Sequence, residues 1–263
     1  MKVPSPRVML PNMFTLAATL CGFSVMWLTM NADSPSDYLT AATLIPLACI
    51  LDGFDGRIAR MVHGETKFGM ELDSLSDAVT FGVAPAFMLY GWALKPYGFA
   101  GLLIAFAFGA ASMMRLARFN VQTADPAKGN RYFTGLPAPM GGLGIASVIA
   151  MQVVLMDRPA VTAFQRPFLA GYAVLLALLM VSEVPFRTFK DVRLTPRVRL
   201  LLVAIVACVV LVSVDTHVMV PLAALHALYL TTGLAGSAIR QTRRRAVAAT
   251  QRGGVVIDED DDA

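Results

Sequence analysis

The sequence predicts an all-α fold, a polytopic helical membrane protein with about eight transmembrane helices and a polar cavity that faces the cytoplasm. Hydrophobic residues make up 56% of the 263 residues and charged residues only 15%, a composition that is rare in a soluble protein of this size. The apolar residues also form long runs separated by short charged loops. This pattern is typical of chains that cross a bilayer several times as helices.

The apolar runs place the first two spans. A short basic entry with Pro11 at its end precedes the first span, from about 13 to 30, and the polar loop NADSPSD (31–37) follows it. The second span begins near residue 38, but its apolar part covers only about 13 residues, against the roughly 20 that a crossing needs. We therefore expect this helix to continue past Asp52.

The third span is expected to end near residue 94. The fourth to eighth spans are expected to cover the following ranges: 99–114, 140–156, 168–181, 200–214 and about 218–239. Residues 1–239 would then form the membrane domain. Residues 240–263 switch from basic to acidic and are expected to be a disordered cytoplasmic tail. The three cysteines lie in apolar runs and are expected to be packing residues: Cys21, Cys49 and Cys208.

The basic residues predict the orientation. Of the 22 Lys and Arg residues, Lys95, Arg158 and Arg166 fall in one set of connections, and the remaining 19 fall in the alternate set. The positive-inside rule places the larger set, with both termini, in the cytoplasm, which requires an even number of spans. The net charge of +4 indicates contact with anionic lipids of the inner (plasma) membrane. The sequence has no interleaved aromatic and basic patch of the kind that binds nucleic acid.

Four carboxylates follow the second apolar run, in the stretch DGFDGRIARMVHGETKFGMELDSLSD (52–77). Asp52 and Asp55 are three residues apart and Asp73 and Asp77 are four apart, so each pair shares one helix face. Two such helices side by side would point four carboxylates into one space. Because hard divalent cations prefer oxygen ligands and relieve the repulsion between the acids, we expect one or two Mg2+ or Mn2+ ions there.

Small and basic residues accompany the acids. Gly56 and Gly69 let a ligand approach the backbone closely. Ala59 has a small side chain and so adds little bulk to the same helix face. Arg60 and Lys67 add positive charge, and an arginine can hold phosphate oxygens with two hydrogen bonds. The set suits a diphosphate. A pair of solvated acidic helix faces is the alternative, but ionisable groups beside membrane-depth helices are usually functional.

The spacing D-x2-D-G-x2-A-R-x8-G-x3-D-x3-D resembles the signature of the CDP-alcohol phosphotransferase family, integral membrane enzymes of phospholipid synthesis. The matching positions are Asp52, Asp55, Gly56, Ala59, Arg60, Gly69, Asp73 and Asp77. The resemblance implies that the four aspartates bind the metal ions and that Asp77 is also the catalytic base. It further implies a set of residues that bind CDP-diacylglycerol: Asn12, Thr15, Gly56, Arg60, Thr66 and Gly69. For Thr15 the alternative is a hydroxyl bonded to its own helix backbone.

Weaker motifs point to one branch of the family. The segments LPNMFTL (10–16), RLARFN (115–120) and TGLPAP (134–139) are similar to those of the membrane-embedded phosphatidylserine synthases. This similarity implies L-serine as the acceptor and a homodimer. Arg115 and Arg118 are then candidates to bind the serine carboxylate or the transferring phosphate, with anchoring at the cytoplasmic surface as the alternative.

Two other functions remain open at this point. The shared signature does not separate acceptors, so glycerol phosphate, inositol phosphate or choline are alternatives to serine. An intramembrane acidic cluster also suits a cation transporter. The residues Gly56, Ala59, Arg60 and Gly69 favour the enzyme, because a cation pathway needs neither small residues nor an arginine beside the acids.

Overall fold

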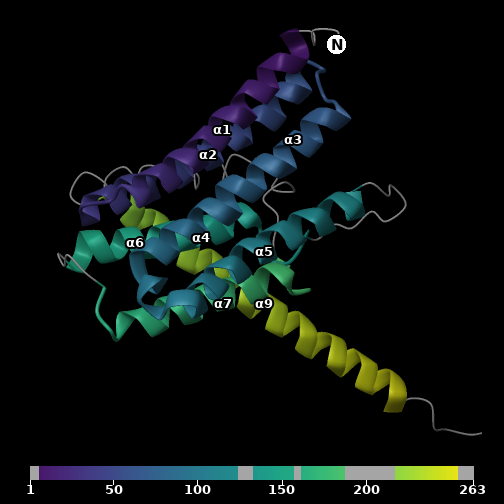
Figure 1. Ribbon diagram of the computed structural model, residues 1–263. Helices are drawn as coiled ribbons and strands as arrows, with labels where there is room; N and C mark the ends of the chain where they lie inside the picture. Colours follow the sequence, from purple (N-terminus) through teal and green to yellow (C-terminus); the bar gives the residue numbers. More distant parts are fainter. Residues whose placement is uncertain (1–5, 124–132, 157–160, 187–216, 254–263) are drawn as a thin grey trace, which may run out of the picture.

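Helices α1 (Pro6–Met30) and α2 (Pro35–Met61) lie side by side and antiparallel in the computed structural model (Figure 1). The structure describes residues 6–123, 133–156, 161–186 and 217–253. The other elements follow in this order: α3 (Lys67–Asp77), η1 (Ala78–Val83), α4 (Ala84–Leu89), η2 (Tyr90–Leu94), η3 (Lys95–Tyr97), α5 (Gly98–Thr123), β1 (Phe133–Thr134), α6 (Ala138–Met156), α7 (Gln165–Val181), β2 (Pro185–Phe186) and α9 (Met219–Gly253).

The helices confirm the predicted membrane fold. Four stretches are long and apolar enough to cross a bilayer, namely Met9–Met30, Pro35–Met61, Lys67–Gln122 and Met219–Ser237, and α6 and α7 contain shorter apolar helices. The third stretch contains two predicted spans, which separate at Gly98, where φ is +55°. The span expected at 200–214 lies outside the described residues, so the count of eight stays a prediction.

The turn between α2 and α3 is short and well defined. As predicted, α2 continues past Asp52 and ends at Met61. His63 adopts a positive φ of 50°, which turns the chain back. Thr66 then begins α3 as its N-cap, and its hydroxyl accepts a hydrogen bond from the Gly69 N–H at 3.0 Å. This turn brings the two halves of the aspartate motif together.

Two π-helical segments, η1 and η2, interrupt the α-helical chain after α3. Segment η1 is wedged between neighbours: a Cβ at Gly22 would lie 2.9 Å from the Thr80 Cα, and one at Gly142 would lie 3.1 Å from the Phe81 carbonyl oxygen. Both contacts are tighter than real side chains tolerate comfortably. The absence of side chains at these two glycines therefore lets α1 and α6 close on η1.

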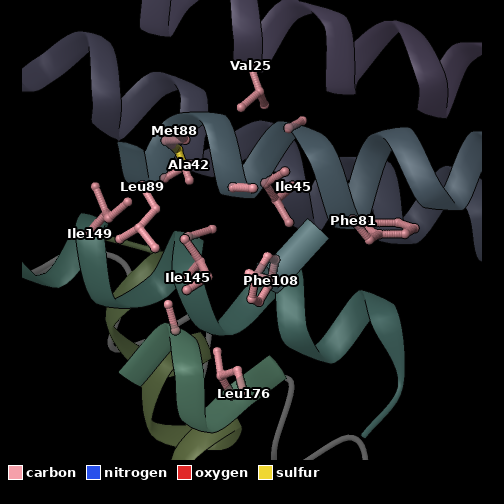
Figure 2. Close-up of a cluster of buried hydrophobic side chains, with 14 of the residues drawn as sticks. Val25, Ala42, Ile45, Phe81, Met88, Leu89, Phe108, Ile145, Ile149 and Leu176 are labelled. Atoms are coloured by element: carbon pink, nitrogen blue, oxygen red, sulfur yellow. The ribbon is translucent and has the colours of Figure 1, made fainter. Parts of the chain in front are cut away.

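The core lies where these segments meet. Figure 2 shows Val25 of α1 above Ile45 of α2, with Phe108 of α5 and Ile145 of α6 side by side below them and Phe81 of η1 at the right. All five side chains are almost completely excluded from solvent. The apolar residues of separate spans thus form one packed interior, above which α1, α2 and α3 project (Figure 1).

A short antiparallel pair of strands joins the chain after α5 to the chain after α7. Strands β1 and β2 contribute two residues each, with Phe133 opposite Phe186. The Gly135 N–H donates to the Val184 carbonyl at 2.9 Å, and Gly135 has a φ of +88° that favours glycine. The segment 134–139 is therefore held against the end of α7, and α6 begins at Ala138.

The last helix is longer than expected. Helix α9 continues through residue 239 to Gly253 and projects away from the other helices in Figure 1. The first part of the predicted disordered tail is therefore helical, and its sequence RRRAVAAT is rich in alanine and arginine, which favour helix. Residues 254–263 lie outside the described part, and the domain boundary stays a prediction.

Candidate active site

Three aspartates from two helices form a compact carboxylate cluster. Oxygens of Asp52 and Asp55 on α2 and of Asp73 on α3 all lie within 4.8 Å of one another. Asp55 is buried, and the other two are partly exposed. Three hard oxygen donors at this separation match the preference of Mg2+ or Mn2+. The donor set therefore fits a divalent cation.

Asp55 is oriented by a residue of α1. Thr15 is 4% exposed, and its hydroxyl donates to Asp55 Oδ2 at 2.7 Å. Its contact with the carbonyl of Pro11 is longer, at 3.3 Å. Thr15 therefore does more than satisfy its own helix backbone, because it fixes one carboxylate of the cluster from a third helix.

Asp77 has both aspartates of the carboxylate cluster and a buried arginine among its electrostatic neighbours. Its carboxylate interacts with Asp52 and Asp73, and it also interacts electrostatically with the Arg115 guanidinium. Arg115 comes from α5, is 9% exposed and also stacks on the Phe119 ring, 5.8 Å from its centroid. Among the described residues, Arg115 of α5 thus sets the surroundings of Asp77 apart from those of Asp52 and Asp55.

A cavity of about 340 Å³ opens beside the cluster, between α1, α2 and α3. It contains all six residues that the sequence assigned to CDP-diacylglycerol, together with two of the cluster aspartates. Its lining is Pro11, Asn12, Thr15, Asp55, Gly56, Ala59, Arg60, Gly64, Glu65, Thr66, Gly69, Met70 and Asp73. A carboxylate cluster and an arginine on the walls of one cavity suit a metal-bound phosphate ligand.

The two glycines of the motif serve different needs. A Cβ at Gly69 would meet the Thr66 hydroxyl at 3.2 Å and the Asn12 side-chain oxygen at 3.3 Å, so the packing of α1 on α3 favours glycine there. A Cβ at Gly56 would meet only Arg60 Nη1, at 3.8 Å, among the described atoms. Because the protein itself leaves room at residue 56, that space is available to a ligand.

Arg118 lies elsewhere. Its guanidinium donates to the Val181 carbonyl at 2.6 Å and the Ser182 carbonyl at 3.3 Å, at the end of α7. An arginine commonly satisfies the last carbonyls of a helix in this way. The structure thus places Arg115 beside Asp77 and Arg118 on the end of α7, although the two are one turn apart on the same helix.

Three features of the site were not predicted from the sequence. Glu65 lines the cavity, and its position beside Thr66 within the motif was the available signal. Asn120 Nδ2 donates to Ser74 Oγ at 2.9 Å and so ties α5 to α3 next to Asp73. Tyr229 of α9 interacts with Arg115, and no local pattern signals this, because Tyr229 is far from the motif in the sequence.

The chain is similar to known proteins over most of its length. The family model described as CDP-alcohol phosphatidyltransferase matches residues 8–184. Proteins named CDP-diacylglycerol–serine O-phosphatidyltransferase from Helicobacter pylori strain J99 and Bacillus subtilis strain 168 are 34% and 32% identical to this chain. The first similarity covers 72% of this chain and 76% of the relative, and the second covers 69% and 91%. An archaetidylserine synthase of Methanothermobacter thermautotrophicus is 29% identical over 68% of this chain and 70% of its own.

Proposed function

Because the chain belongs to the CDP-alcohol phosphatidyltransferase family, we propose that it transfers the phosphatidyl group of CDP-diacylglycerol to the hydroxyl of L-serine. The products are phosphatidylserine and CMP. The observation that carries the proposal is the cavity that Arg60 and Gly56 line together with Asp55 and Asp73 of the carboxylate cluster. The names of the bacterial relatives support serine as the acceptor.

Members of this family use divalent metal ions. The cluster of Asp52, Asp55 and Asp73 is the site that would hold one or two Mg2+ or Mn2+ ions. Asp77 would be a further ligand that the ions share. Bound there, the metal would supply positive charge to the phosphate oxygens and to the departing CMP. Thr15 keeps Asp55 turned toward the cluster through its 2.7 Å hydrogen bond.

The protein's own residues bind the substrate and move the proton. Arg60 holds the diphosphate, and the open space at Gly56 admits it close to the α2 backbone. Asp77 accepts the proton of the serine hydroxyl. The serine oxygen forms a bond to the phosphorus attached to diacylglycerol, and the bond from that phosphorus to the CMP oxygen breaks. Arg115, next to Asp77, binds the serine carboxylate.

The cavity faces the cytoplasm in this proposal, with the protein in the inner (plasma) membrane as a homodimer. The distribution of Lys and Arg supports the orientation. In a variant without native cysteines, Met61→Cys at the end of α2 should react with an impermeant thiol reagent only from the cytoplasmic side of sealed vesicles. Ser36→Cys, at the start of α2, should react only from the other side. The reverse pattern would refute the orientation.

Another acceptor is the closest alternative. Purified protein with CDP-diacylglycerol and separately labelled serine, glycerol phosphate, inositol phosphate and choline should convert serine into lipid and release an equal amount of CMP. Efficient conversion of a different alcohol, with none of serine, would refute the proposed acceptor. The family match disfavours a cation transporter. A transporter would also not be expected to release CMP in detergent solution, where no ion gradient exists.

A further inference from the structure

The cavity beside the carboxylate cluster extends from the cluster to the turn that joins α2 and α3. Asp55 and Asp73 line it at the cluster, whereas Glu65 lines it in the turn. At a rise of about 1.5 Å per residue, Asp55 lies roughly 8 Å along α2 from Arg60. By the same measure, Asp73 lies roughly 10 Å along α3 from Thr66. Glu65 is therefore about two helical turns away from the cluster.

Helix α1 follows the same order along the cavity. Thr15 lies at the cluster, where its hydroxyl donates to Asp55. Asn12 lies about one turn earlier on α1, beside the start of α3: a Cβ at Gly69 would be 3.3 Å from the Asn12 side-chain oxygen and 3.2 Å from the Thr66 hydroxyl oxygen. The end of the cavity away from the cluster is therefore polar. We call it the turn end, and it is lined by Asn12, Gly64, Glu65 and Thr66.

Glu65 supplies the turn end with a hydrogen-bond acceptor that the protein does not use. Within the described part of the chain, its side chain makes no hydrogen bond or ion pair, and the residue is exposed. The neighbouring Thr66 hydroxyl, in contrast, already accepts the Gly69 N–H at 3.0 Å. An ionised carboxylate accepts hydrogen bonds and donates none. The turn end is therefore suited to a ligand that presents a donor there.

The chemistry of CDP-diacylglycerol determines which part of it reaches the turn end. In the proposed function, its diphosphate lies between the carboxylate cluster and Arg60. The diacylglycerol on one side of the diphosphate stays in the hydrocarbon of the bilayer, because its acyl chains are apolar. The cytidine on the other side then extends toward the polar turn end. The exocyclic amino group of cytosine is a hydrogen-bond donor at the position where uracil has an acceptor oxygen.

We propose that Glu65 is a specificity-determining residue that selects cytosine by accepting a hydrogen bond from its exocyclic amino group. This inference rests on the proposed function, since it places CDP-diacylglycerol in the cavity. A carboxylate facing the O4 oxygen of uracil would bring two acceptors together without a proton between them. A uridine nucleotide is therefore bound more weakly, and Glu65 acts on the base rather than on the metal or the phosphates.

The test measures the dissociation constants of CDP and UDP by calorimetry, with the purified full-length protein in detergent and Mg2+. Glu65→Gln keeps the size of the side chain, but an amide can accept from cytosine or donate to uracil. Glu71→Gln is the matched control, because Glu71 is an exposed glutamate of α3 outside the cavity lining. The KM values for CDP-diacylglycerol and UDP-diacylglycerol and the thermal stability are measured for each variant.

The wild-type protein should bind CDP about tenfold more tightly than UDP. Glu65→Gln should bring this ratio close to one, by weakening CDP and strengthening UDP, and the two KM values should follow. Glu71→Gln should keep the wild-type ratio, and all three proteins should have similar thermal stability.

Loss of a negative charge near an anionic ligand would by itself strengthen both nucleotides equally. An unchanged ratio in Glu65→Gln, or a wild-type protein without a preference for CDP, would therefore overturn the inference, while wild-type serine transfer left the proposed function intact. If the wild-type protein shows the Glu65-dependent preference but transfers nothing to serine, the proposed acceptor is refuted and the inference stands.

Discussion

Two regions of the molecule meet at Asp77, and they are built in different ways. The α2–α3 hairpin supplies the carboxylate cluster and much of the cavity from residues that lie within 52–77. The α5–α9 region supplies Arg115 and Tyr229 from helices that are far apart in the sequence. In the first region, helical spacing and one short turn determine which side chains meet. In the second region, the packing of several spans determines it.

The two arginines of α5 show the consequence. Arg115 and Arg118 are three residues apart and carry the same charge, yet Arg115 is buried beside Asp77 and Arg118 binds carbonyls at the end of α7. Their spacing suggests a shared face, as for Asp52 and Asp55. The partners of Arg118 lie on α7, and a local sequence pattern does not contain the position of that helix.

The largest effect is expected within the cluster. Asp52→Asn, Asp55→Asn and Asp73→Asn should each lower turnover by about a thousandfold or more, because an amide lacks the charge of a metal ligand worth several kcal/mol in the transition state. EDTA should abolish activity, and added Mg2+ or Mn2+ should restore it. Asp33→Asn, an exposed aspartate at the other end of α2, is the matched control. Full activity in EDTA would contradict the metal site.

Asp77 tests whether the boundary between the two regions is also a boundary between roles. Asp77→Asn should lower the single-turnover rate roughly 10²- to 10⁴-fold, as expected for loss of a general base, while the affinity for CDP-diacylglycerol changes little, because the three cluster aspartates remain. Asp73→Asn should weaken both rate and affinity. The two variants are isosteric and lie one turn apart on α3. Equal losses of affinity for CDP-diacylglycerol would therefore show that Asp77 and Asp73 do not have different roles.

The arginine pair sharpens the comparison on the α5 side. Arg115→Lys keeps the charge but loses the planar fork, and kcat/KM for serine should fall about tenfold or more. Arg118→Lys should leave kcat/KM near the wild-type value but lower the free energy of unfolding by about 1 to 2 kcal/mol, through weaker bonds to the Val181 and Ser182 carbonyls. Activity and thermal denaturation in detergent measure the two effects. A similar loss of activity in both variants would indicate that Arg118 also acts in the active site.

The success of the sequence predictions also differed between the α2–α3 hairpin and the α5–α9 region. The spacing in 52–77 predicted a shared carboxylate site, and the short apolar run before it predicted the continuation of α2 past Asp52, because each depends on residues a few positions apart. The bond from Thr15 to Asp55 was not predicted, since it depends on the rotation of α1. The roles of the individual residues stay proposals.

The π-helical segment after Asp77 was also not predicted. Its close neighbours include Gly22 of α1 and Gly142 of α6, and these glycines lie far from η1 in the sequence. The same holds for the β1–β2 pair, whose strands are separated by two helices. Long-range contacts of this kind carry no local signature, so the sequence predicted the apolar runs but not the contacts between them.

The smallest effect concerns Thr66, which belongs to both the fold and the cavity. Its hydroxyl accepts from the Gly69 N–H as the N-cap of α3, and its side chain also lines the cavity. Thr66→Ala should lower the free energy of unfolding by about 1 kcal/mol through loss of the cap. Thr66→Asn should restore stability, because asparagine is an effective N-cap, but should still bind CDP-diacylglycerol a few-fold more weakly if the threonine also contacts the nucleotide. Affinity that recovers fully together with stability would show that Thr66 acts on the ligand only by starting α3, and the local pattern that predicted a binding residue would then have detected a helix cap.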